Sequence, residues 1–424
     1  MTSILLKNIL LDSTPRDILV EGERISRIAP AGESSGWALA DGCEVCDCKG
    51  CVAAPGFINM HTHAGMSIMR GVGEDMLFHD WLAHIWKIEA QLDEEFVYWS
   101  AKVGCIEMIR TGTTTFNDMY WHHRAARKAA AETGIRIAGG LTMMDQGDIS
   151  EAERQIGTLE RSYEEDKAFY EGAIYIPSVH AVYSVSAPLF RKASDFARRH
   201  GLRLHLHLAE TRKEVEDCKA AHGGMTPVGY LDSLGILGPE VIAAHSLWLT
   251  PEDIRILGRN GVTCVHCVNS NAKLSSGYRF MDKELQAAGA NVCIGTDSAC
   301  SSNNLDMLEA MKTSAILQKA WREDPTSMPL GELMQMATSR GARALGIDAG
   351  RIREGALADI LIVDTDNSFF LSPAPFEANF VYSAHSDCIR SVIAGGRFVM
   401  RDRVIPGEKE TLEGARKVLA RLEL

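Results

Sequence analysis

The chain has 424 residues, of which 46% are hydrophobic, and a formal net charge of −12. This length is ample for a large buried core and predicts a main domain with a smaller one beside it. The acidic balance argues against nucleic-acid binding, because phosphate contacts need clustered Lys and Arg, and it favours a small-molecule substrate.

The first residues, MTSILLKNILLDSTPRD, lack the basic start and long apolar run of a secretory signal. No apolar stretch of about 18 residues or more follows that could span a bilayer. We therefore expect a cytoplasmic protein without a membrane partner. The 11 Cys are not expected to form a disulfide framework.

The segment 1–54 alternates short apolar runs with turns and predicts a small β-rich region. The runs are Ile4–Leu6, Ile9–Leu11, Ile18–Val20 and Ile25–Ile28. Four cysteines follow within one short stretch: Cys43, Cys46, Cys48 and Cys51. A four-cysteine zinc site normally joins two pairs held apart by a longer loop, so we interpret these as small buried residues near a turn.

From Pro55 onward, short apolar segments that end in polar residues alternate with helix-length segments. Eight such segments are Gly56–His63, Thr113–Asp118, Ile135–Leu141, Ala173–His180, Arg203–His207, Val241–His245, Val262–His266 and Asn291–Asp297. Alternating β and α units argue for a parallel sheet, and eight units predict a closed (β/α)8 barrel over residues 55–352.

Beyond the barrel the pattern returns to strands. They are expected at Asp359–Val363, Ile389–Ile393 and Arg397–Met400, with a final helix over Leu412–Leu424. Both chain ends, 1–54 and 353–424, are thus expected to form one small β-sandwich. The predicted fold class is α/β, a TIM-like barrel with this composite sandwich beside it.

His and Asp residues gather at the carboxyl ends of the predicted barrel strands, the face where active sites of such barrels are built. His61 and His63 are two residues apart on one strand, so their side chains point the same way. His207, His245 and Asp297 end three further strands. Histidines with a carboxylate suit zinc or a similar divalent ion and leave a place for water.

Other interpretations must be weighed at these positions. A lone histidine is more often a core or surface residue than a ligand, but independent core histidines have no reason to recur at strand ends. We assign His205 and His266 to packing inside the barrel. Glu210 either reaches a substrate or serves as a carboxylate at a helix N-terminus. Asp297 has an alternative as a helix or turn cap.

Other catalytic signatures are absent from the sequence. There is no G-x-S-x-G elbow, no H-E-x-x-H motif and no P-loop. The zinc motif of cytidine-deaminase-type enzymes is also missing. The histidine set is therefore the main candidate for chemistry.

Several ordered segments resemble motifs of the amidohydrolase superfamily, and more narrowly the branch with S-adenosylhomocysteine/methylthioadenosine deaminases and s-triazine hydrolases. They are PGFINMHTH (55–63), HLHLAET (205–211), AAHSLWLT (243–250), VHCVNSNAKLSSG (265–277) and GTDSACSSNN (295–304). EGALADILIVD (354–364) resembles the strand that returns into that family's β-sandwich. The resemblance covers nearly the whole chain.

The resemblance implies one divalent metal ion, usually zinc and sometimes iron. Its ligands would be His61, His63, His207 and Asp297. Glu210 matches the acid that moves a proton to a ring nitrogen, and His245 matches the histidine that polarises the attacking water. Asp297 would help to orient that water and to accept its proton.

Substrate contacts are implied at Trp81, Glu89 and His180, together with Glu210. S-adenosylhomocysteine-type enzymes are similar in carrying an Arg after the third strand that holds the amino-acid tail. Residues 137–148 contain no Arg. Trp86 and Met69 could line a pocket, but ordinary helix packing is the favoured interpretation for both.

The implied function is hydrolytic deamination, with release of ammonia, of an adenosine-like nucleoside such as 5′-methylthioadenosine, adenosine or S-adenosylhomocysteine. One alternative is deamination or dechlorination of an s-triazine or another heterocycle. A more remote alternative is a non-catalytic binding scaffold, although such a protein should have lost its metal ligands. Members of this family are often dimers or larger, so the resemblance leaves open that this chain forms a homo-oligomer.

Overall fold

A computed structural model describes residues 3–169 and 173–422 of the chain. One eight-stranded sheet is built from both chain ends. Its strands run in the order β17-β16-β15-β5-β1-β2-β3, with β4 also paired to β1. They are β1 (Ser3–Leu11), β2 (Thr14–Glu21), β3 (Arg24–Pro30), β4 (Glu44–Asp47), β5 (Cys51–Pro55), β15 (Ile360–Asp364), β16 (Ile389–Ala394) and β17 (Arg397–Met400). The division into 1–54 with 353–424 and 55–352 stays a prediction.

Strand β1 joins two runs that the sequence pattern separates. Its pairing with β2 shifts register between Leu6 and Ile9, and Asn8 has φ +59° at that point. Asn tolerates this left-handed conformation better than most residues. The N–H of Asn8 donates to Asp17 Oδ1 at 2.9 Å. A bulge, rather than a turn, therefore divides the two apolar runs.

The cysteine cluster is only partly buried. Cys48 and Cys51 are buried as expected, whereas Cys43 and Cys46 are half-buried, which corrects the expectation for those two. Among the described residues, the side chains that lie close enough together to hold a metal ion are all His or Asp, and no cysteine is one of them. All eleven cysteines are free.

The remaining strands form the (β/α)8 barrel, and all their pairings are parallel. One set is β6 (Phe57–Thr62), β7 (Thr113–Asp118) and β8 (Arg136–Gly139); the other is β9 (Thr142–Met143), β10 (Ser178–Val179), β11 (Leu204–Leu208), β12 (Val241–His245), β13 (Thr263–His266) and β14 (Asn291–Ile294). Isolated parallel bridges, Thr62 with Asp297 and Ala138 with Ile174, link the two sets.

Fifteen α-helices lie in the described part of the chain. They are α1 (Phe78–Glu89), α2 (Glu94–Arg110), α3 (His123–Thr133), α4 (Ile149–Phe169), α5 (Ala187–Arg199), α6 (Arg212–Ala221), α7 (Pro227–Ser233), α8 (Pro251–Arg259), α9 (Val268–Lys273), α10 (Asp282–Ala288), α11 (Met307–Arg322), α12 (Leu330–Met336), α13 (Ser339–Leu345), α14 (Phe376–Tyr382) and α15 (Glu408–Leu419). None of them combines the length and apolar character needed to cross a membrane.

Three predicted elements differ from the structure. The third barrel strand ends at Gly139, and a separate short β9 follows it. The fourth shrinks to Ser178–Val179, directly after Pro177, which has no N–H to donate to a neighbouring strand. The last helix begins at Glu408 and ends at Leu419, and residues 423–424 lie outside the described residues.

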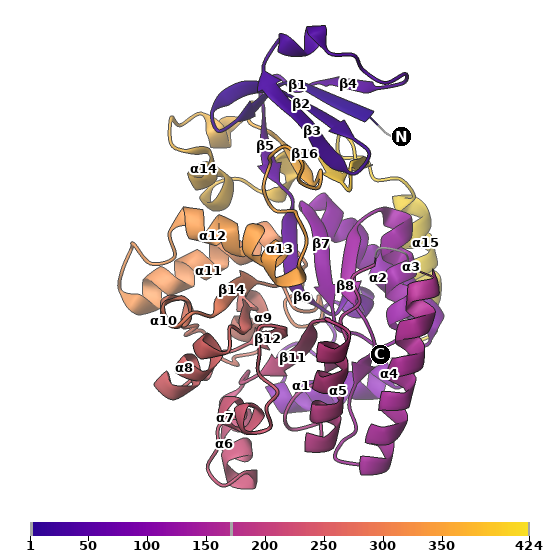
Figure 1. Cartoon of the computed structure of the whole chain (residues 1–424), viewed down its shortest axis with the longest axis vertical. Helices are drawn as coiled ribbons and strands as arrows, with labels where there is room; N and C mark the ends of the chain where they lie inside the picture. The colour runs from indigo at the N-terminus through magenta and orange to yellow at the C-terminus, as the bar shows by residue number, and fades with distance from the viewer. Residues whose placement is uncertain (1–2, 170–172, 423–424) are drawn as a thin grey trace.

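Figure 1 shows how this arrangement positions the site. The sheet strands β1–β4 lie at one end of the molecule, and α1 lies in the opposite half. Helix α1 follows β6 in the chain, so it comes after the carboxyl end of the first barrel strand. Active sites of such barrels are built at the carboxyl ends of the strands, and the polar cluster described below lies there.

Candidate active site

The polar cluster is built from residues at or just beyond the carboxyl ends of barrel strands. His61 lies in β6, His207 in β11, and His245 is the last residue of β12. Asp297 follows the end of β14. His245 has φ +67° and Asp297 φ +64°. Left-handed backbone is uncommon for such residues, and its concentration at one point indicates a site that the surrounding structure holds in place.

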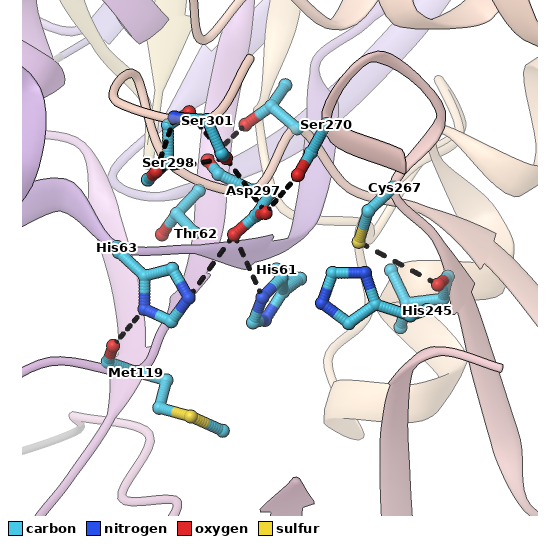
Figure 2. Close-up of polar contacts among 12 residues, drawn as sticks. His61, Thr62, His63, Met119, His245, Cys267, Ser270, Asp297, Ser298 and Ser301 are labelled. Atoms are coloured by element: carbon cyan, nitrogen blue, oxygen red, sulfur yellow. Dashed lines mark hydrogen bonds and ion pairs between the residues drawn. The ribbon is translucent and has the colours of Figure 1, made fainter. Parts of the chain in front are cut away.

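Histidine nitrogens and one carboxylate oxygen converge in this cluster. His61 Nε2 lies 3.3 Å and His63 Nε2 3.2 Å from Asp297 Oδ1. Figure 2 shows both rings directed at that carboxylate, with His245 on the other side of His61. Two groups have donor atoms within 4.8 Å of one another, namely His61, His207 and His245, and His61, His63 and Asp297. The structure thus brings together every predicted ligand, and His245 with them.

The electrostatics of the cluster suit a cation. Burial lowers the pKa of His61 to about 4 and that of His207 well below its ordinary value. Burial opposes the charge on Asp297, but the close approach of His61 and His63 holds the pKa of its carboxyl well below the ordinary value. Burial opposes the charge on His63, but the neighbouring carboxylate of Asp297 raises the pKa of His63 to about 9, so metal binding would displace a proton from this ring. The neutral imidazoles of His61 and His207 beside an ionised carboxylate are already in the protonation states that metal binding requires.

The two carboxylate oxygens of Asp297 have different surroundings, and only Oδ1 faces the centre of the site. Ser270 Oγ and Ser301 Oγ donate to Oδ2 at 2.5 and 2.9 Å, which leaves Oδ1 facing the two histidines. The serines therefore orient the carboxylate and satisfy the oxygen that points away. Hydrogen bonds of this kind to a ligating carboxylate fix its orientation.

His205 has a role beyond packing. It is fully buried, as expected, and its Nε2 lies 3.0 Å from Nδ1 of His61. Its Nδ1 in turn lies 3.1 Å from the side-chain amide of Asn117. His266 is buried too, with its ring stacked on Phe280 at 4.3 Å. His205 thus supports a predicted ligand, whereas His266 only packs.

A proton-transfer pair lies beside the cluster. Glu210 Oε2 is 3.7 Å from His245 Nε2, and both side chains are buried. Burial raises the pKa of Glu210 above its ordinary value, which favours a form that carries a proton. Asn271 Oδ1 lies 2.8 Å from His245 Nδ1. Because a carbonyl oxygen only accepts, Nδ1 holds the proton and Nε2 presents a lone pair towards Glu210.

The cluster opens into a cavity of about 670 Å³, counting its mouth. The predicted substrate residues Trp81, Glu89 and His180 all line it, together with Glu210. Burial raises the pKa of Glu89 and lowers that of His180 to about 3. A pocket with apolar walls and a few polar groups suits a small organic molecule.

Helix α1 supplies much of the cavity wall. Trp86 lines it, and its ring lies 6.1 Å from that of His180, which corrects the expectation of mere helix packing for Trp86. Met69 is buried in the core beneath, as expected. The periodicity of an amphipathic helix cannot distinguish a core from a cavity wall, because both are apolar.

Sequence reasoning missed the residues that hold the site in place. Asn271 and Ser270 lie inside the segment VHCVNSNAKLSSG, so their motif was visible although their roles were not. Asn117 carried no signal of its own. Each acts through a hydrogen bond to a residue that is close in space but distant along the chain, and spacing along the chain does not reveal such partners.

The family model described as "Amidohydrolase family" matches residues 52–399. The chain belongs to the amidohydrolase family. This amidohydrolase is 40% identical over 423 residues to a 5′-deoxyadenosine deaminase of Methanoregula boonei, covering 99% of this chain and 95% of that protein. It is 39% identical to a 5-methylthioadenosine/S-adenosylhomocysteine deaminase of Archaeoglobus fulgidus, with 99% of each chain covered.

A solved structure of an adenosine deaminase from Xanthomonas campestris with bound zinc superposes on this amidohydrolase with a TM-score of 0.89. The two are 28% identical, and the match covers 99% of this chain and 98% of that one. The predicted fold class and the membership of the deaminase branch are thereby confirmed. The chain is a hydrolase that acts on carbon–nitrogen bonds.

The donor set of this amidohydrolase fits a divalent metal ion, and zinc in particular. The buried Nε2 of His61 has no hydrogen-bond partner with good geometry, although it points at Asp297. Leaving such an atom unpaired costs about 1–3 kcal/mol, and a metal ion would satisfy it. Imidazole nitrogens with one carboxylate are ligands that zinc prefers.

Proposed function

We propose that this amidohydrolase is a zinc-dependent deaminase of adenosine-like nucleosides that carry a small, uncharged 5′ group. The observation that carries the proposal is the pairing of Glu210 with His245 directly beside a histidine and aspartate donor set. A hydrolysis at an amine-bearing ring carbon needs those parts, namely activated water, a base for its proton and an acid for the ring.

His61, His63, His207 and Asp297 would hold the ion. A bound zinc ion would lower the pKa of its water to about 7 and so make hydroxide available at neutral pH. Nε2 of His245 accepts the proton of the attacking water, because Asn271 keeps the proton of that ring on Nδ1. Asp297 orients the water through Oδ1, since Oδ2 is held by two serines.

Glu210 delivers a proton to the ring nitrogen adjacent to the attacked carbon. The buried carboxyl retains a proton more readily than an exposed one, so it can donate as negative charge develops on the ring. The departing amine takes up the proton that His245 accepted from the water and leaves as ammonia, and the hydroxyl proton of the intermediate returns to the carboxylate of Glu210. General acid catalysis of this kind typically contributes about 10²- to 10⁴-fold in rate.

The cavity wall argues for a small, uncharged 5′ group. Within the described ranges, none of the side chains lining the cavity is a Lys or an Arg. Arg154, the nearest Arg after the third strand, pairs with Glu151 on the exposed side of α4. The carboxylate of an amino-acid tail would therefore lose its hydration without gaining a cation. Trp86 and Tyr183 instead offer apolar surface around His180.

The test is ammonia release by the zinc-loaded protein from 5′-deoxyadenosine, 5′-methylthioadenosine, adenosine and S-adenosylhomocysteine. The first three should be turned over with kcat/KM at least about tenfold above that for S-adenosylhomocysteine, a difference of about 1.4 kcal/mol. Preferential turnover of S-adenosylhomocysteine would overturn the 5′-group assignment. Silence on all four with zinc bound would overturn the nucleoside assignment.

Glu210→Gln distinguishes deamination from the rival reaction, dechlorination of a triazine. A chloride leaving group needs no proton, whereas ammonia does, so the presence of Glu210 favours deamination. The variant should lose at least about 100-fold in ammonia release while its zinc content stays at the wild-type level. Unchanged turnover would remove Glu210 from the mechanism.

A further inference from the structure

A second buried carboxylate lies next to Glu210 and has no place in the chemistry above. Glu214 is on α6, and only 3% of its surface is exposed. Its Oε1 accepts the backbone N–H of Ala209 at 2.9 Å, and its Oε2 accepts the backbone N–H of Glu210 at 2.8 Å. The carboxylate thus spans two consecutive peptide groups of the turn that presents Glu210.

That turn has a backbone conformation that needs support. Ala209 has φ +50°, in the left-handed region, which costs a residue with a Cβ about 1–2 kcal/mol. The carbonyl of Ala209 accepts the N–H groups of Leu247 at 3.2 Å and Trp248 at 2.9 Å. Glu214 therefore holds one side of the turn, and the segment after β12 holds the other.

The contact also departs from ordinary helix capping. Thr211 is the N-cap of α6, and its Oγ1 accepts the N–H of Glu214 at 3.1 Å. In a capping box the third helical residue reaches back to the N–H of the cap residue. Glu214 passes over Thr211 and takes the two N–H groups before it, so its contacts serve the turn rather than the helix end.

We infer that Glu214 is a positioning residue that fixes Glu210 for proton transfer. The inference rests on the proposed function, since it assigns Glu214 to the same acid. Two hydrogen bonds to one buried carboxyl group determine where the Cα of Glu210 lies, and a displacement of about 1 Å is enough to impair a proton donor. Gln at this position could accept only one of the two N–H groups, because its NH2 group is a donor.

The experiment compares Glu214→Gln with Glu216→Gln, a control whose side chain is exposed on the same helix. Ammonia release from 5′-deoxyadenosine should fall about 10- to 100-fold in kcat for Glu214→Gln, with KM within about threefold and zinc content unchanged. The control should match the wild type. An unchanged kcat for Glu214→Gln would overturn the inference.

A double variant separates positioning from a general structural role. If Glu214 acts through Glu210, Glu214→Gln should cost less than about twofold when Glu210 is already Gln. An equal loss in both backgrounds would overturn the inference. Should Glu214→Gln fold poorly, the comparison is repeated with Ala209→Gly in every protein, because Gly adopts φ +50° without strain.

Amide hydrogen exchange gives a readout that does not depend on turnover. The amides of Ala209 and Glu210 should exchange faster in Glu214→Gln than in the wild type and in Glu216→Gln. Equal exchange would overturn the inference even if activity falls. A wild-type protein that deaminates no nucleoside would instead defeat the proposed function, and the exchange data would still report on the turn.

Discussion

Replacing Asn271 tests whether its side chain determines which ring nitrogen of His245 carries the proton. Asn271→Leu removes the acceptor that lies 2.8 Å from Nδ1 while keeping similar volume. The ring is then free to hold its proton on Nε2, the atom that lies 3.7 Å from Glu210. Loss of such a supporting partner typically costs about 10- to 100-fold in activity, or about 1.4–2.7 kcal/mol of transition-state stabilisation.

Stability should change much less than activity. The lost hydrogen bond is worth about 1 kcal/mol, but Nδ2 of Asn271 is a buried donor without a partner, and the substitution removes it as well. The two effects oppose each other, so the free energy of unfolding should stay within about 1 kcal/mol of wild type. Denaturant unfolding measures this term separately from turnover.

The assay is ammonia release from 5′-deoxyadenosine, with zinc content measured on the same samples. Asn271→Asp is the matched control, because it keeps an acceptor at the same position and should retain kcat within about tenfold of wild type. A wild-type kcat in Asn271→Leu would refute the tautomer argument. So would an equal loss in both variants with intact zinc.

Three further predictions concern the metal, one ion pair and pH. Chelation should abolish ammonia release and lower Tm, and zinc at about 1,000 times its Kd should restore both with about 4 kcal/mol of stabilisation; activity in metal-free protein would contradict this. Arg136→Ala should cost about 3 kcal/mol or more in denaturant unfolding, since Arg136 Nη1 lies 2.6 Å from the buried carboxylate of Asp359; a loss below about 1 kcal/mol would show that the pair is dispensable. Burial raises the pKa of Glu214 from 4.5 to about 7. Between pH 4.5 and pH 7, the carboxyl of Glu214 therefore keeps its proton in the folded chain but has lost it in the unfolded chain. The free energy of unfolding should therefore fall with rising pH in this window, by at most about 1.4 kcal/mol per unit, and Glu214→Gln should lack that part of the slope.

Much of the fold followed from local patterns. Alternating strand and helix segments predicted the barrel, and the return to strands after the barrel predicted that both chain ends share a sheet. The predicted strand boundaries were wrong where a single residue changed the local backbone. Asn8 turns a predicted break into a bulge, and Pro177 shortens a barrel strand by removing a donor.

The sequence by itself determined the chemistry available to this protein. Strand periodicity placed His61 and His63 on one side, and strand ends placed His207, His245 and Asp297 on the same rim, because parallel strands in a barrel end together. Both placements follow from the two-residue period of a strand and from the repeated β–α units, and both patterns are visible in the sequence.

Only the tertiary structure decided how those groups are held and what they face. The partners of the reacting groups, such as Asn271 for His245 and Glu214 for Glu210, come from turns and helices whose paths depend on the packed barrel. The same applies to Trp86, whose apolar ring faces the cavity rather than the core. Hydrogen bonds and cavity walls are set by distances in space, and spacing along the chain does not encode them.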